Sequence, residues 1–214
     1  MSGLRTPPFC AGETTGEDQP IAAFAFRSQN ESMQRVLILF ATKEGQTQKV
    51  ATRIFEHFEN AGVIGHLVNA ADSSAVKQID LDSFDLLVFG ASMHAGGLER
   101  ELVDFVNTNA HQIEKQARSF FLVLLSAATR DSALKDESLA DARLKMQRQL
   151  SVQFDDTEMI AGALAYSKYS FPLKWVMRRI AAKAGEGTDM SHDYEYTDWL
   201  QVERYANRLI GFPR

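Results

Sequence analysis

Residues 42–47, Thr-Lys-Glu-Gly-Gln-Thr, place short hydroxyl side chains and a glycine between a run of apolar residues and a helical pattern. The N–H groups of such a loop, with the free N–H groups and positive dipole end of the following helix, can bind an anion. Gly45 permits a positive φ and a close approach of the backbone. The candidate binding residues of this first loop are Thr42, Lys43, Glu44, Gly45, Gln46 and Thr47.

Two common nucleotide fingerprints are absent from the first loop. It has no G-x-G-x-x-G, which argues against NAD, and no G-x-x-x-x-G-K-[ST], which argues against ATP or GTP. The single phosphate of a mononucleotide fits it better. An ordinary capped turn without a ligand explains the loop equally well, so the loop alone leaves both interpretations open.

Two further loops of small residues follow apolar runs. The second loop contributes the candidates Ser92, Met93, His94, Ala95 and Gly96, and the third contributes Ser126, Ala127, Ala128, Thr129 and Arg130. Small residues allow a loop to lie along a flat ring. His94 is a candidate donor to a ligand, although a single loop histidine is commonly only solvated, and Arg130 is a candidate through its position alone.

These loops follow segments that read as buried strands. Five nearly continuous apolar runs alternate with amphipathic helical patterns; the runs lie at residues 36–41, 66–70, 85–92, 119–127 and 159–166. One helical pattern ends at Gly62, and three others cover residues 99–110, 135–150 and 198–210. Thr197 is the expected N-cap of the last one. The alternation predicts an α/β fold: a doubly wound, five-stranded parallel sheet with helices on both faces.

Ligands of such sheets bind beyond the carboxyl ends of the strands, near the point where the strand order reverses. All three loops are expected at that edge, and together they are more informative than any one of them. Flavin mononucleotide (FMN) would use all three, with its phosphate in the first loop and its ring between the second and third. We expect no metal and identify no side chain as a catalytic acid or base.

Bulk composition limits the remaining function classes. The chain has 214 residues, of which 45% are hydrophobic, enough for one domain with a sizeable core. A formal net charge of −5 gives no general reason to expect nucleic acid. The single cysteine, Cys10, excludes an intrachain disulfide and favours a reducing compartment. No run approaches the ~20 apolar residues that span a bilayer.

The chain divides into a leader and a domain. Residues 1–32 hold three of the five prolines without sustained periodicity, and we predict a disordered or weakly ordered leader. Residues 33–214 are predicted to form the FMN-binding domain, with a basic insert region at residues 166–195. Met33 would also serve as a translation start for a complete domain.

Two stretches resemble known families. Residues 39–47, LFATKEGQT, resemble the first FMN loop of flavodoxins, with Gln46 where many members carry Asn. Residues 160–189, IAGALAYSKYSFPLKWVMRRIAAKAGEGTD, with YTDW at 196–199, resemble the bacterial quinone-dependent protoporphyrinogen IX dehydrogenase family. GASMHAG at residues 90–96 occupies the corresponding second loop, and the match covers roughly residues 36–209.

The resemblance implies a flavodoxin-like fold, FMN as cofactor, and oxidation of protoporphyrinogen IX to protoporphyrin IX in haem biosynthesis. It implies that electrons pass to a membrane quinone, menaquinone or ubiquinone. By residue match, the resemblance implies FMN contacts at Thr42, Gly45, Gln46 and Thr47, and further contacts in the second and third loops. Family members often carry an aromatic residue in the second loop, where this chain has Met93-His94-Ala95.

Residues 166–184 form a basic segment in an otherwise acidic chain. They contain no acid and five basic residues, leaving 18 Lys and Arg against 28 Asp and Glu elsewhere; the five are Lys168, Lys174, Arg178, Arg179 and Lys183. The pattern predicts a basic amphipathic helix that binds an anionic membrane surface at the cytoplasmic, inner face of the cell membrane. The alternative is a helix whose apolar side packs on the sheet while its basic side is solvated. Tyr166, Tyr169 and Trp175 could line a site for a flat, apolar porphyrin or quinone, or they could be core or wedge residues, and we favour the second interpretation.

Two rival functions remain open. A soluble flavodoxin-type electron carrier without porphyrinogen activity would bind the same FMN, but such carriers usually present an acidic docking face rather than a basic segment. A flavodoxin-fold protein that has lost its cofactor would bind none.

Overall fold

The computed structural model describes residues 33–94, 96–168, 174–175, 178–179, 182 and 189–212. The predicted leader at residues 1–32 lies outside this range, as do most residues of the predicted basic helix. Both therefore stay predictions.

Five parallel strands form the central sheet in the order β2-β1-β3-β4-β5. The strands are β1 (Arg35–Phe40), β2 (Ile64–Asn69), β3 (Leu86–Ser92), β4 (Ala117–Leu124) and β5 (Asp156–Ala161). This order is that of a flavodoxin-like doubly wound sheet. The predicted fold class is confirmed.

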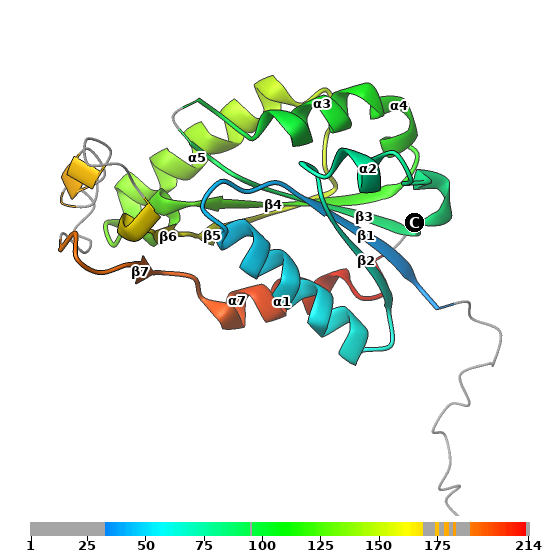
Figure 1. Cartoon of the computed structure of the whole chain (residues 1–214), viewed down its shortest axis with the longest axis horizontal. Coiled ribbons are helices and arrows are strands. Elements are labelled where there is room, and N and C mark those ends of the chain that lie inside the picture. The colour runs from blue at the N-terminus through cyan, green and yellow to red at the C-terminus, as the bar shows by residue number, and fades with distance from the viewer. Residues whose placement is uncertain are drawn as a thin grey trace, which may run out of the picture. The chain divides into compact units, whose positions relative to one another are not determined.

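Helices cover both faces of the sheet (Figure 1). On one face α1 (Gln46–Asn60) and α7 (Trp199–Leu209) share a core with β1 residues such as Ile38. On the other face α3 (Arg100–Thr108) and α5 (Ser132–Gln149) share a core with β1 residues such as Leu37. Successive strand residues point to opposite faces, so a strand covered on both sides must be apolar throughout.

Shorter elements complete the described fold. They are α2 (Ser73–Val76), η1 (Leu81–Ser83), α4 (Ala110–Ile113), η2 (Leu125–Ala128), β6 (Ala163–Leu164), η3 (Tyr166–Lys168) and β7 (Tyr194–Glu195). Strands β6 and β7 pair antiparallel, outside the main sheet. Tyr166 is fully buried against the Tyr194 ring, as expected of a core residue.

Two strands end earlier than their apolar runs. β4 ends at Leu124, and η2 follows, so Ser126, Ala127 and Ala128 lie in a tight turn. β5 ends at Ala161, because the chain leaves the sheet at Gly162, whose carbonyl accepts a hydrogen bond from the N–H of Tyr196. The third loop is therefore shorter and more regular than a simple strand-end loop.

The expected N-cap of the last helix was wrong by one residue. Asp198 caps α7, and its carboxylate accepts from the N–H groups of Leu200 and Gln201. Thr197 instead donates its hydroxyl to the carbonyl of Ala161 at 2.7 Å. A carboxylate at the N-cap is favoured by two charge-assisted bonds and by the helix dipole.

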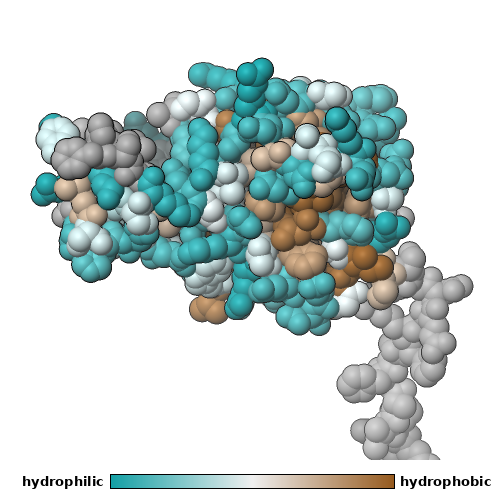
Figure 2. All heavy atoms as spheres, viewed as in Figure 1, coloured by the Kyte–Doolittle hydropathy of each residue, from teal (hydrophilic) through white to brown (hydrophobic). Residues whose placement is uncertain are grey.

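Hydrophilic side chains cover most of the face shown in Figure 2, and hydrophobic ones gather on the side away from β7. Among the helices of the described ranges, none has the length and hydropathy required to cross a bilayer.

The strand order reverses between β1 and β3, because the chain adds β2 on one side of β1 and β3 on the other. The loops after these two strands lie side by side, and Ala41 N–H donates to the carbonyl of Gly90 at 2.9 Å. The first and second predicted loops therefore meet at the switch point of the sheet, where doubly wound folds bind ligands.

Candidate functional site

The first loop turns sharply into α1 at Gly45. This residue has φ +97°, and its N–H donates to the hydroxyl Oγ1 of Thr42 at 2.9 Å. A positive φ is strained for residues with a side chain, so glycine is required for this turn. Helix α1 begins at Gln46 and has no acidic residue in its first turn. Its first N–H groups and positive dipole end are therefore available to an exogenous anion.

Thr47 provides the test of fit for a phosphate. The residue is fully buried. Among the buried side-chain oxygen and nitrogen atoms that the structure describes, its Oγ1 is the one without a hydrogen-bond partner. An unpaired buried hydroxyl costs about 1–3 kcal/mol. Thr47 lies in the first turn of α1, so one bound anion would satisfy the hydroxyl and the helix N–H groups together. The first loop therefore fits the phosphate of a mononucleotide.

The other residues of the first loop have different surroundings. The Gln46 side chain turns toward the end of β5, where its Nε2 donates to Thr197 Oγ1 at 2.8 Å. Lys43 is exposed and Glu44 is half-buried. Gln46 therefore supports the loop through its side chain, and only its backbone N–H remains for a ligand.

The second loop contains a cluster of polar side chains. Ser92 donates both its N–H (3.1 Å) and its hydroxyl to the carboxylate of Glu99, which is only 4% exposed. Nε2 of His94 lies 3.0 Å from Ser92 Oγ and 3.4 Å from Glu99 Oε1. A second carboxylate, that of Glu44, lies 3.9 Å from the same nitrogen. The imidazole of His94 is thus oriented by groups from two loops.

Glu99 was not among the predicted site residues. It precedes the apolar positions of α3, and in the sequence it looks like any glutamate at the start of a helix. Its burial depends on the fold of the second loop, where His94 and Gly97 exchange backbone hydrogen bonds. Ala95 lies outside the described residues, and a Cβ added to Gly96 would meet no atom of the described residues within 4 Å beyond its chain neighbours.

The third loop lies next to the second because β4 is the neighbour of β3. Met93 N–H donates to the carbonyl of Val123 at 2.9 Å. Ala127, Ala128 and the exposed Arg130 line a hollow of about 360 Å³. Thr129 follows η2, and its N–H donates to the carbonyl of Ser126. The three predicted loops are therefore brought together along the carboxyl edge of β1, β3 and β4.

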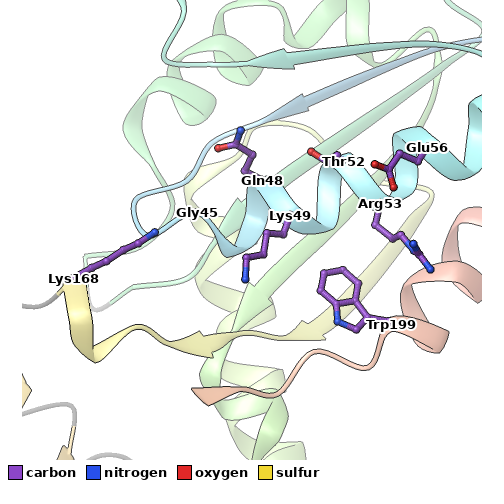
Figure 3. Close-up of a pocket in the computed structure, with 8 residues that line it drawn as sticks. All are labelled: Gly45, Gln48, Lys49, Thr52, Arg53, Glu56, Lys168 and Trp199. Atoms are coloured by element: carbon purple, nitrogen blue, oxygen red, sulfur yellow. The ribbon is translucent and has the colours of Figure 1, made fainter. Parts of the chain in front are cut away.

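A groove of about 660 Å³ lies beside α1 and reaches the first loop at Gly45 (Figure 3). Two of its cations face acids: Lys49 pairs with Glu195 at 2.7 Å and Arg53 with Glu203 at 2.5 Å. The hydrogen bond from Lys49 lowers the pKa of the Glu195 carboxyl. At the loop end of the groove Lys168 extends from η3 toward Gly45 (Figure 3). In the sequence Lys168 is only one of the basic residues of segment 166–184, and its position at this loop was not predicted.

The sequence is similar to curated proteins named protoporphyrinogen IX dehydrogenase [quinone]. The Escherichia coli (strain K12) protein is 26% identical over 82% of this chain and 94% of its own length. The Leishmania major protein is 24% identical over 84% of this chain and 76% of its own length. The resemblance inferred from residues 160–199 is confirmed.

Comparison of structures finds oxidised flavodoxin 1 from Bacillus cereus, with a TM-score of 0.48 and 14% identity over 85% of this chain and 100% of that chain. A family profile described as a flavodoxin domain matches residues 37–191. This range contains all three loops, the switch point and Thr47, whose hydroxyl has no partner among the described residues. The chain belongs to the family of flavodoxin domains, and the prediction that its cofactor is FMN is confirmed.

Proposed function

We propose that this oxidoreductase converts protoporphyrinogen IX to protoporphyrin IX and passes the electrons to a membrane quinone, menaquinone or ubiquinone. The observation that carries the proposal is the match to relatives named for this reaction, which extends over 94% of the Escherichia coli protein. A shared cofactor domain alone would support only flavin chemistry. A match that continues through the segment after β5 supports the more specific function.

The FMN phosphate is proposed to bind at the first loop, which is called the phosphate end below. The N–H groups that follow Gly45 and the hydroxyls of Thr42 and Thr47 are suited to a phosphate because they are donors at a helix N-terminus. The flavin ring is proposed to lie between the second loop, Ser92 to Gly96, and the third, Ser126 to Arg130. These two loops are called the ring end.

FMN, when bound, supplies the two-electron redox chemistry of the reaction. The chain binds and orients the cofactor, and its second loop holds a titratable group at the ring end. Nε2 of His94 is fixed by Ser92 and Glu99, so any proton on this nitrogen occupies a defined position. Removal of six electrons from the porphyrinogen requires three rounds of binding or three successive two-electron steps at one site.

Access to a membrane quinone is proposed to depend on the basic segment at residues 166–184. In its described part Trp175 is 51% exposed, and the guanidinium of Arg179 lies 4.9 Å from the centre of the Trp175 ring. An exposed tryptophan beside cations suits an anionic membrane surface at the inner face of the cell membrane. Replacing Lys174, Arg178 and Arg179 by Glu should abolish binding to anionic liposomes, and unchanged binding would refute this attachment.

The reaction is tested by an anaerobic assay of the FMN-loaded protein with protoporphyrinogen IX and either quinone. The expected result is porphyrin fluorescence that appears only when flavin and quinone are both present, with matching reduction of the quinone. If no flavin-dependent porphyrin forms while the flavin still exchanges electrons with redox dyes, the chain is instead an electron carrier.

A further inference from the structure

Lys168 lies at the phosphate end, although it belongs to a segment 124 residues farther along the chain. Its ammonium donates a hydrogen bond to the carbonyl oxygen of Glu44. A Cβ added to Gly45 would lie 3.3 Å from the same nitrogen. Figure 3 shows the side chain extending from η3 toward the turn where α1 begins. The ammonium is therefore adjacent to the helix N-terminus that the FMN phosphate is proposed to occupy.

We propose that Lys168 is a phosphate-binding residue, carried to the first loop by the turn that follows β6. This inference rests on the proposed placement of the FMN phosphate at residues 42–47. A phosphate monoester carries close to two negative charges at neutral pH, whereas a helix N-terminus provides only about half a positive charge. The first loop contains one acid, Glu44, and one exposed cation, Lys43. An additional ammonium beside Gly45 would offset most of the negative charge that remains.

The turn that carries Lys168 is firmly anchored. Tyr166 is fully buried against Leu164 and Tyr194. The next residue, Ser167, donates its N–H and its hydroxyl to the carboxylate of Asp193, at 2.8 and 2.6 Å. The N–H of Lys168 itself donates to the carbonyl of Ala165 at 2.9 Å. Because this bond and the two preceding residues fix the turn, the backbone of Lys168 is held at the loop, which lowers the entropic cost of ordering its side chain when phosphate binds.

The other cations of the groove differ from Lys168 in their partners. Lys49 and Arg53 each face a carboxylate, whereas the described contact of Lys168 at the loop is to a neutral carbonyl oxygen. Exchanging a carbonyl for a phosphate oxygen would strengthen this hydrogen bond, because bonds between two charged groups are about twice as strong as neutral ones. The same exchange would be less favourable for Lys49, because breaking its pair would leave Glu195 without its cation.

Paired titrations with FMN and riboflavin test the proposal, because the two ligands differ only by the phosphate. Apo-protein is titrated with each ligand by flavin fluorescence, in the wild-type chain, Lys168→Met, Lys168→Arg and the control Lys49→Met. We expect Lys168→Met to weaken FMN binding about ten-fold, as loss of one charge-assisted bond would. Riboflavin binding should not change, Lys168→Arg should retain most of the FMN affinity, and Lys49→Met should match the wild type.

The possible outcomes distinguish the placement of the phosphate from the role of Lys168. If the wild-type chain binds FMN no better than riboflavin, the phosphate placement is wrong, and the role of Lys168 fails with it. If the wild-type chain prefers FMN and Lys168→Met keeps the full preference, the placement stands and the role of Lys168 is refuted. Equal loss of FMN and riboflavin in Lys168→Met would mean that the lysine supports the fold of the loop, and would also refute the proposal.

Discussion

At the phosphate end a buried hydroxyl and the first N–H groups of α1 converge, whereas at the ring end the polar side chains bond to one another. Thr47 Oγ1 has no partner in the described part of the chain. Ser92, His94 and Glu99, by contrast, form a connected cluster. The first arrangement is complete only with a ligand, and the second is complete without one.

This difference has an energetic meaning. A site with unpaired buried donors is destabilised until its ligand binds, so binding recovers free energy that the apo-protein lacks. A closed cluster stabilises the apo-protein and holds a surface against which a ring can lie. We therefore expect substitutions at the phosphate end to change affinity, and substitutions at the ring end to change stability first.

The largest change in affinity is expected from Gly45→Asp. Aspartate would strain the backbone at φ +97° and place a carboxylate beside the phosphate. FMN affinity should fall at least about 100-fold, which corresponds to about 2.8 kcal/mol at about 1.4 kcal/mol per factor of ten. Flavin fluorescence titration measures it.

Gly62→Asp is the matched control for this substitution. Gly62 lies just beyond the other end of α1 and also has a positive φ, of +76°. Among the described residues, no atom beyond its chain neighbours lies within 4 Å of a Cβ added there. This variant should lose similar backbone stability yet bind FMN normally. Unchanged FMN affinity in Gly45→Asp, or an equal loss of FMN affinity in both variants, would show that the phosphate does not bind at the first loop.

The ring end is tested by Glu99→Ala. The substitution removes the acceptor of the Ser92 N–H and hydroxyl and one partner of His94. Since the cluster is buried, we expect the free energy of unfolding of the apo-protein to fall by about 2–3 kcal/mol. Urea unfolding measures this loss. Glu101→Ala, at an exposed position in the first turn of α3, is the control and should change stability little. An equal loss of stability in the two variants would show that the buried cluster does not stabilise the apo-protein.

A smaller effect is expected from Asp193, which anchors the turn of Lys168. Hydrogen bonds from Ser167 lower the pKa of its carboxyl, with a further contribution from the charge of Lys168. Because the folded pKa lies below the usual value of about 3.9, this stabilisation is present above that value and is lost as the pH falls through the folded pKa.

The stability difference between the wild-type chain and Asp193→Asn should therefore be constant from pH 7 to 5. It should shrink below about pH 4, where the carboxyl of the unfolded chain becomes protonated first, and vanish at lower pH, where the folded carboxylate is protonated as well. Urea unfolding across this range measures the difference. A gap that widens at low pH would contradict the assigned pairing with Ser167.

Local signals made much of the fold predictable from the sequence. Strands buried on both faces must be apolar throughout, so runs such as residues 36–41 identified them. A positive φ at Gly45 was also predictable, because a glycine between a strand and a helix commonly occupies such a turn. The three loops could be placed at one edge because parallel strands share the direction of their carboxyl ends.

Contacts between distant segments could not be predicted in the same way. Lys168 was grouped with the basic residues around it, and its contact with Glu44 spans 124 positions. Glu99 was missed because its burial depends on how the second loop folds back. Thr197 was expected as a helix cap because hydroxyls are common there, but its hydroxyl bonds to Ala161 and the adjacent Asp198 is the stronger cap.

Thr47→Val tests most directly the claim that the phosphate end is completed by its ligand. Valine preserves the shape of the side chain and removes the hydroxyl that lacks a partner among the described residues. The account predicts that the apo-protein unfolds at the same or a higher urea concentration, while FMN binds about ten-fold more weakly and riboflavin binds as before. A destabilised apo-protein with unchanged FMN affinity would contradict it.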